Sequence, residues 1–233
     1  HALLESKTKF SDIGLVVIDE QQRFGTTQRK KLLELSSQKY APHFLAMTAT
    51  PIPRTLALTF YGDLDLSIIG EKPQERKKVE TYLIRPEKRD ELRGFVKKEI
   101  EKGHQVFVIC PRVEIGNEKL EMRNNGLEIK NEIKAVKEEY ERIKNIFPEF
   151  NVEMMYGKMK SAEKENALKK LQSGETQILV ASSVVEVGID LPLATVVIIE
   201  SSERFGLSQL HQLRGRVGRS IHQSYCFLIM EKY

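Results

Sequence analysis

The chain has 233 residues, of which 40% are hydrophobic and 30% are charged. This balance excludes a disordered chain, because that apolar fraction can bury enough surface to offset the entropy lost on folding. A formal net charge of +4 is too small for a strongly basic nucleic-acid tail, so any polyanion must be bound by individually placed residues. The sequence has no run of about 18 apolar residues, so we expect no membrane span.

The cysteines and the amino terminus exclude further classes of protein. Cys110 and Cys226 make neither a metal-ligand set nor a disulfide framework, which fits a reducing cytosol. Residues 1–4 are not followed by an apolar core, so no signal peptide is expected. Because the sequence has no initiator Met, we expect it to be a fragment.

The first part of the chain predicts two short strands and a linker. The apolar run 15–18 ends in Asp19 and Glu20 and is typical of a buried parallel strand. A second run, 44–47, is the next predicted strand. Residues 70–78 are rich in proline and charge, so we interpret them as a linker between two lobes.

The second part alternates strands and helices. Strands are predicted at residues 79–84, 105–110, 152–156, 177–181, 195–200 and 224–230. Apolar residues recur at helical spacing in 92–100 and 129–143, a third helix begins with Ser161 as its expected N-cap, and 113–127 resemble a surface loop. This alternation predicts an α/β fold with a mostly parallel sheet covered by helices.

Asp19 and Glu20 are the first candidates for chemistry. They end a predicted strand, and α/β sheets bind ligands at the carboxyl ends of their strands. Two carboxylates there suit a nucleoside triphosphatase, in which one holds hydrated Mg²⁺ and the other orients or deprotonates the attacking water. An exposed acidic pair that begins a turn is the alternative.

Residues 212–219 (Gln-Leu-Arg-Gly-Arg-Val-Gly-Arg) are the second candidate. On a helix, Arg216 and Arg219 would share a face, and Gly215 and Gly218 would allow a close approach. Two guanidinium groups on one face suit polyphosphate oxygens and would act as arginine fingers across a cleft. A basic helix that contacts DNA phosphates fits the pattern equally well.

Polar residues also follow two other predicted strands. Gly188 and Asp190 can shape the edge of a nucleotide site, and Ser182 with Ser183 can donate hydrogen bonds to backbone phosphates. A turn with a capping Asp is the alternative. Thr48 and Thr50 suit a relay between a nucleotide site and a bound strand, or a simple polar strand end.

These segments occur in the order of the superfamily 2 helicase motifs. The resembling segments are 19–22 for motif II, 48–51 for motif III, 188–190 for motif V and 212–219 for motif VI. Three longer segments are similar to those of RecG-type ATP-dependent DNA helicases. They are Arg-Phe-Gly at 23–25, Thr-Pro-Ile-Pro-Arg-Thr-Leu at 50–56 and the block 203–219. The resemblance covers essentially the whole chain.

The resemblance implies two RecA-like lobes with ATP between them. It implies an incomplete first lobe at residues 1–72 and a nearly complete second lobe at 73–233. It also implies a role for each candidate residue in ATP hydrolysis: Asp19 binds Mg²⁺, Glu20 activates water, and the triphosphate is contacted by Gln212, Arg216 and Arg219. The nucleotide is bordered by Gly188 and Asp190, and the ATP site is coupled to DNA by Gln22, Thr48 and Thr50. The DNA backbone is bound by Gly157, Lys158, Met159, Ser182 and Ser183.

The implied activity is ATP-driven translocation on double-stranded DNA. The implied cofactors are ATP and Mg²⁺, and the implied partners are stalled forks and Holliday junctions in the cytoplasm of a bacterium. We favour a monomer with no membrane contact.

The sequence departs from the family pattern in three places. Gln22 and Tyr156 each stand where the family usually has His. No Gly-x-x-x-x-Gly-Lys-Ser/Thr loop occurs, so we expect the phosphate-binding loop upstream, together with a DNA-wedge domain, and a translocation element downstream. The 233 residues alone should therefore have negligible ATPase activity.

Two alternatives stay open at this point. A transcription-repair coupling translocase shares several of these sequence motifs. Phe205 and His211 favour the RecG type over such a translocase. A non-catalytic DNA-binding module is permitted by Gln22 and the missing loop, although it would not need the retained acids and arginines.

Overall fold

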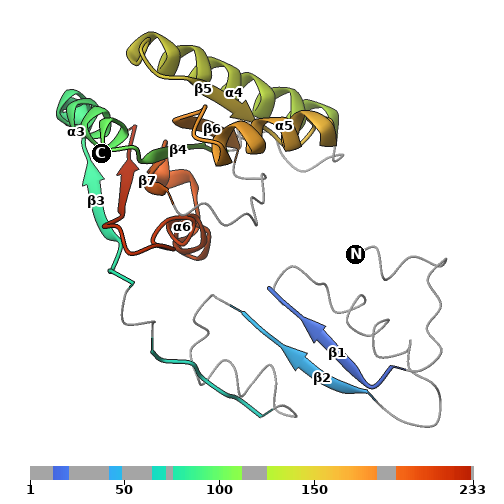
Figure 1. The fold of residues 1–233 in the computed structure, drawn as a ribbon. Coiled ribbons are helices and arrows are strands. Elements are labelled where there is room, and N and C mark those ends of the chain that lie inside the picture. The colour runs from blue at the N-terminus through green and yellow to red at the C-terminus, as the bar shows by residue number, and fades with distance from the viewer. Residues whose placement is uncertain are drawn as a thin grey trace. The chain divides into compact units, whose positions relative to one another are not determined.

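The computed structural model describes residues 13–20, 42–48, 65–71, 76–111, 125–182 and 193–231. The chain divides into two compact units, His1–Ile68 and Ile69–Tyr233, and each is described by itself. The predicted lobe boundary between residues 72 and 73 stays a prediction. Figure 1 labels most of the helices and strands.

The described part of the first unit is a pair of parallel strands. β1 (Leu15–Ile18) and β2 (His43–Ala46) pair in register from Leu15 opposite His43 to Ile18 opposite Ala46. Val16 and Ile18 are buried, whereas Leu15 and Val17 are exposed. The strand is therefore apolar on both faces, but only one of its faces is packed.

The second unit is built on a six-stranded sheet (Figure 1). Its strands are β3 (Glu80–Ile84), β4 (Gln105–Cys110), β5 (Val152–Met155), β6 (Ile178–Ser182), β7 (Ala194–Ile199) and β8 (Tyr225–Ile229). Their order is β3-β8-β7-β4-β6-β5, and every pair is parallel. The predicted α/β fold with a parallel sheet is confirmed.

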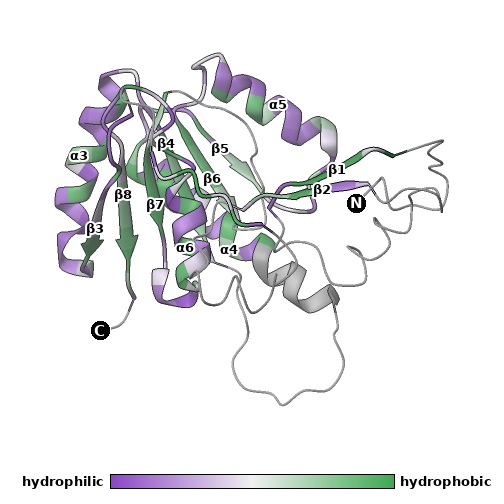
Figure 2. Cartoon of the chain, turned by 90° about the horizontal axis from the view of Figure 1, so that it is seen from below, coloured by the Kyte–Doolittle hydropathy of each residue, from purple (hydrophilic) through white to green (hydrophobic). Residues whose placement is uncertain are grey.

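Helices cover both faces of this sheet. They are α3 (Arg89–Glu101), α4 (Asn125–Ile146), α5 (Ser161–Gln172) and α6 (Leu207–Arg214), with short 3₁₀ turns η3 (Pro86–Lys88) and η4 (Ser202–Arg204). Leu92 of α3 and Val136 of α4 belong to one core cluster, whereas Leu171 of α5 belongs to the other and Leu213 of α6 packs against it. Figure 2 shows α3 and α5 with hydrophobic and hydrophilic sides.

Alternate residues of one strand enter the two clusters. In β4, Val106 and Val108 pack with α3 and α4, and Phe107 and Ile109 pack on the opposite face. All six β4 residues are buried, because a central parallel strand is covered on both sides. This burial explains why the sequence shows a continuous apolar run and not an alternating pattern.

Two local predictions were wrong. Ser161 is the first helical residue of α5, and its N-cap is Lys160. Lys160 is extended, and its backbone N–H donates to Oε2 of Glu163 at 3.0 Å, so a carboxylate in the first turn replaces the expected serine cap. The predicted loop 113–127 was wrong only at residues 125–127, which belong to α4, whereas residues 113–124 lie outside the described residues. Among the described residues, no helix is long and apolar enough to cross a membrane.

Candidate functional site

The carboxyl edge of the first unit carries three predicted site residues. Asp19 and Glu20 follow β1, and Thr48 follows β2. The Met47 N–H donates to the Ile18 carbonyl at 2.8 Å, so the parallel ladder continues up to these residues. The structure therefore brings Asp19, Glu20 and Thr48 to one edge of the strand pair.

The backbone turns sharply at the acidic pair. Oδ1 of Asp19 accepts a hydrogen bond from the Glu20 N–H at 2.8 Å, and Glu20 has a left-handed φ of 51°. A left-handed φ costs roughly 1–2 kcal/mol for a residue with a Cβ. Such backbone strain is concentrated at functional sites, which fits the role expected for this pair.

The donor set at this edge fits Mg²⁺. No group of three or more His, Cys, Asp or Glu side chains that could hold a metal ion occurs among the described residues. Mg²⁺ needs no such group, because it keeps several waters and takes one or two carboxylates plus substrate phosphates. Asp19 is exposed at the end of its strand and can supply that one carboxylate.

The residues of motif VI lie partly on α6 and partly beyond it. Gln212 is on the helix, which ends at Arg214 with Gly215 as its C-cap. Arg216 and Arg219 therefore do not share a helix face, and this prediction was wrong. The reason is the glycine pair: Gly215 ends the helix, and Gly218 has a φ of +78°.

A buried residue fixes the turn that carries the two arginines. Val217 is 3% exposed and packs into the core cluster of α5 and α6. Arg216 and Arg219 flank it and are half-buried, and Nε of Arg219 donates to the Gly215 carbonyl at 3.5 Å. The arginines thus extend from a compact turn anchored in the sheet's core.

The segments expected to contact DNA meet at one edge of the six-stranded sheet. β5 and β6 are parallel neighbours with Met155 opposite Ala181, so residues 157–159, which follow β5, lie at the same edge as Ser182, the last residue of β6. Lys158 is exposed, whereas Ser182 is 1% exposed and its hydroxyl has no hydrogen-bond partner within the part of the chain that the structure describes.

The remaining predicted site residues lie outside the described residues. They are Gln22, Thr50, Ser183, Gly188 and Asp190.

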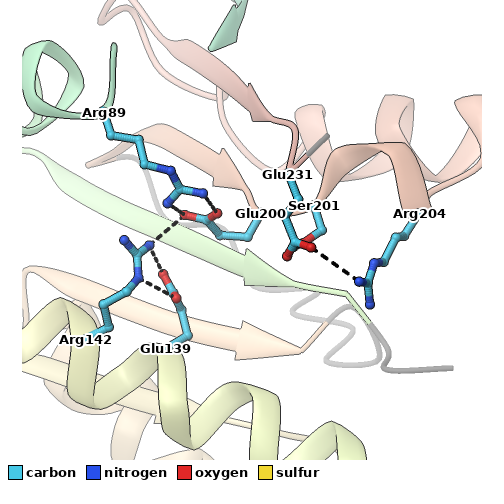
Figure 3. A network of polar contacts seen from close by, with 7 residues as sticks. All are labelled: Arg89, Glu139, Arg142, Glu200, Ser201, Arg204 and Glu231. Carbon is cyan, nitrogen blue, oxygen red and sulfur yellow. Dashed lines mark hydrogen bonds and ion pairs between the residues drawn. The ribbon is translucent and has the colours of Figure 1, made fainter. Parts of the chain in front are cut away.

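Sequence reasoning missed a charged network at the end of β7 (Figure 3). The guanidinium of Arg89 donates to both carboxylate oxygens of Glu200, and Nη2 of Arg142 donates to Oε1 of Glu200 at 2.8 Å. Arg142 also donates to Glu139, with Nε to Oε2 at 2.7 Å. Burial, with the nearby Glu139 carboxylate, raises the pKa of Glu200, and the two arginines oppose this shift.

This network joins α3, α4 and the end of β7. Some of its residues also line a small pocket, together with Val96, Ile143 and Ile198. A charged residue at the end of the predicted strand 195–200 was the one signal available. Its partners could not be identified from the sequence, because Arg89 is 111 positions away from Glu200.

A second polar contact lies beside the first. Ser201 has a left-handed φ of 48° and donates its hydroxyl to Glu231, which also accepts from Arg204 at 3.4 Å (Figure 3). These bonds hold the connection between β7 and η4.

Comparison with known proteins identifies the second unit. The family model described as "Helicase conserved C-terminal domain" matches residues 87–220. The chain belongs to this family. The match lies wholly inside the unit that carries the six-stranded sheet, α6 and the motif VI turn.

The relatives extend the similarity to the whole chain. The ATP-dependent DNA helicase RecG of Synechocystis sp. is 50% identical over 229 residues, which is 98% of this chain and 26% of the relative. RecG of Bacillus subtilis is 44% identical over 232 residues, which is 99% of this chain and 32% of the relative. The expected RecG resemblance is confirmed, and the chain spans about a quarter to a third of these relatives.

Solved structures agree with the family. A structure of RecG bound to a three-way DNA junction has a TM-score of 0.70 and 39% identity, and the match covers 100% of this chain and 28% of that one. The helicase MrfA bound to DNA and AMPPNP has a TM-score of 0.61 at 18% identity, over 94% of this chain and 31% of that one, and supports the fold alone.

Proposed function

We propose that this chain is part of an ATP-dependent DNA helicase that translocates on double-stranded DNA and remodels branched substrates such as stalled forks and Holliday junctions. The observation that carries the proposal is that 98% of this chain matches part of RecG, at 50% identity over 229 residues. The match to RecG in complex with a three-way junction supports branched DNA as the partner.

In the first unit, Asp19 and Glu20 serve ATP hydrolysis. Asp19 holds Mg²⁺ through its exposed carboxylate, and Glu20 orients and deprotonates the attacking water. Mg²⁺, when bound with ATP, neutralises charge that develops on the phosphates. Thr48 at the same edge, with Gln22 and Thr50, couples hydrolysis to DNA binding. Gln can donate and accept a hydrogen bond but cannot become charged, so Gln22 couples through hydrogen bonds alone.

In the second unit, Gln212, Arg216 and Arg219 contact the triphosphate. A guanidinium group suits this task because its planar fork donates two parallel hydrogen bonds to phosphate oxygens and stays charged. Gly188 and Asp190 border the nucleotide. The glycine turn places both arginines on a short, anchored segment, and this supports a role in catalysis over diffuse contact with a backbone.

DNA is held at the carboxyl edge of β5 and β6. The exposed Lys158, with Gly157 and Met159, contacts backbone phosphates, and Ser183 contributes hydrogen bonds. Such contacts position a duplex without reading its sequence, as a translocating enzyme requires. Ser182 is 1% exposed, so the predicted contact of its hydroxyl with DNA does not fit this conformation. ATP and chromosomal DNA meet in the bacterial cytoplasm, so we place the protein there, as a monomer.

The test uses the complete protein that carries this chain, with labelled DNA of defined shape. With ATP and Mg²⁺, it should separate a three-way junction into its arms and leave a linear duplex of equal length intact. With ADP, neither substrate should change. A protein that binds both DNA shapes equally and separates neither would contradict the proposal.

A further inference from the structure

Gly218 approaches another segment more closely than any side chain could. A Cβ at this position would lie 2.6 Å from Cγ2 of Val79, a distance that real Cβ atoms do not reach. Its φ of +78° independently favours glycine. Two separate constraints, conformation and space, therefore act at one residue of motif VI.

Val79 belongs to the segment that leads into β3. The two residues beside it also contact the chain that follows motif VI: Nε2 of Gln223 donates to the Lys78 carbonyl at 2.9 Å, and the Glu80 N–H donates to the Ser224 carbonyl at 3.0 Å. Three consecutive residues, 78–80, thus hold the loop 218–224. Lys78 is the last residue of the predicted linker.

The same contacts lie next to the segment that carries the two arginines. Val79 packs, partly buried, against the core cluster that contains Val217. Val217 and Gly218 lie between Arg216 and Arg219, so a shift of this turn would redirect both guanidinium groups.

We propose that Val79 is a positioning residue: its contact with Gly218 orients Arg216 and Arg219 and thereby links the end of the linker to ATP hydrolysis. This inference rests on the proposed function, in which these arginines contact the triphosphate. A displacement of about 1 Å at a catalytic group can cost on the order of 10²-fold in rate.

The test is a double-mutant cycle in the complete protein, read as kcat for DNA-stimulated ATP hydrolysis. Gly218→Ala adds a methyl group against Val79 and should lower kcat on the order of 10²-fold. Val79→Ala removes the contact and should lower kcat about 10-fold. In the double variant the added methyl group occupies the vacated space, so kcat should exceed that of Gly218→Ala. The affinity for the junction should stay within about twofold in all variants, because the residues proposed to contact DNA are at the ends of β5 and β6, at the opposite edge of the sheet from β3.

Gly174→Ala is the matched control for backbone strain. Gly174 also has a φ of +78°, but a Cβ there would meet nothing within 4 Å. This variant carries the same strained φ without the contact with Val79, so it should lower Tm, though less than Gly218→Ala, while kcat stays unchanged. A loss of kcat that came from the strained φ alone would appear in both glycine variants.

The possible outcomes separate the two proposals. If the unsubstituted protein hydrolyses ATP and the effects of Val79→Ala and Gly218→Ala multiply without rescue, the positioning role is wrong and the proposed function stands. If Gly218→Ala retains full kcat, the positioning role is also wrong. If the unsubstituted protein shows no DNA-stimulated hydrolysis, the proposed function fails and this inference fails with it.

Discussion

Arg89 and Glu200 form a two-pronged ion pair, with Nη2 to Oε2 at 2.9 Å and Nη1 to Oε1 at 3.2 Å. The pair joins the first turn of α3 to the residue that follows β7. The Glu200 side chain is only 11% exposed. Loss of Arg89 would therefore leave a nearly buried negative charge with one fewer positive partner.

Arg89→Ala should lower the free energy of unfolding by about 1–3 kcal/mol, less than for a fully buried pair because Arg89 remains partly exposed. Arg93→Ala is the matched control on the same helix: its partner, Asp90, is 86% exposed, so the change should stay within about 0.5 kcal/mol. Urea denaturation of both variants measures the difference. Equal losses would show that the Glu200 network adds nothing beyond a surface pair.

Stability should depend on pH through Glu99. Burial would raise the pKa of this carboxyl, but hydrogen bonds from Lys102 at 2.6 Å and His104 at 2.8 Å outweigh burial and lower it. A lowered pKa in the folded state stabilises the fold above the ordinary value of 4.5, and this stabilisation is lost as pH falls through the folded-state value.

Glu99→Gln should therefore lower Tm clearly at pH 7, with a smaller difference from the unsubstituted chain below pH 4. Glu101→Gln, at an exposed position of the same helix, should change Tm little at either pH. Thermal unfolding followed by circular dichroism at the two pH values gives both differences. A Glu99→Gln difference that grows in acid would contradict the assigned charge state.

The two thiols should be inert in the folded chain. Cys110 is 2% exposed and Cys226 is 0% exposed. Burial raises the pKa of both thiols, to about 11 for Cys226, and the thiolate is the reactive form. A colorimetric disulfide reagent at pH 8 should detect no fast-reacting thiol in the native chain and both thiols in guanidinium. A fast-reacting thiol in the native chain would disprove this burial.

The strands were predictable because their burial leaves a plain signal. Residues 106–110 and 196–199 are continuous apolar runs, as expected for central parallel strands. The site was less predictable. The helix expected to carry Arg216 and Arg219 ends two residues before the first of them, and Gly215 after a last turn rich in basic residues was a C-cap signal that could have shown this.

Other features depend on contacts that no local pattern contains. Gly218, in the loop before β8, lies close to Val79, in the segment before β3. Arg89 contacts Glu200, which is 111 positions away in the sequence. The motifs therefore name candidate residues, whereas the placement of those residues follows from tertiary packing.

The arginines of motif VI should act on the chemical step. In the complete protein, Arg216→Ala or Arg219→Ala should lower kcat for ATP hydrolysis on the order of 10³-fold or more, as expected for an arginine finger. Lys169→Ala, which removes one positive charge from the exposed side of α5, should leave kcat unchanged. If junction binding collapses and hydrolysis per bound complex stays normal, these arginines contact the DNA backbone.

The role of this chain in a DNA-dependent motor is tested by the rate of ATP hydrolysis by the complete protein, measured with and without a three-way DNA junction. The junction should stimulate hydrolysis, and Glu20→Gln should abolish it while junction binding is retained. Stimulated hydrolysis that persists in Glu20→Gln, or no hydrolysis in the unsubstituted protein, would contradict this role.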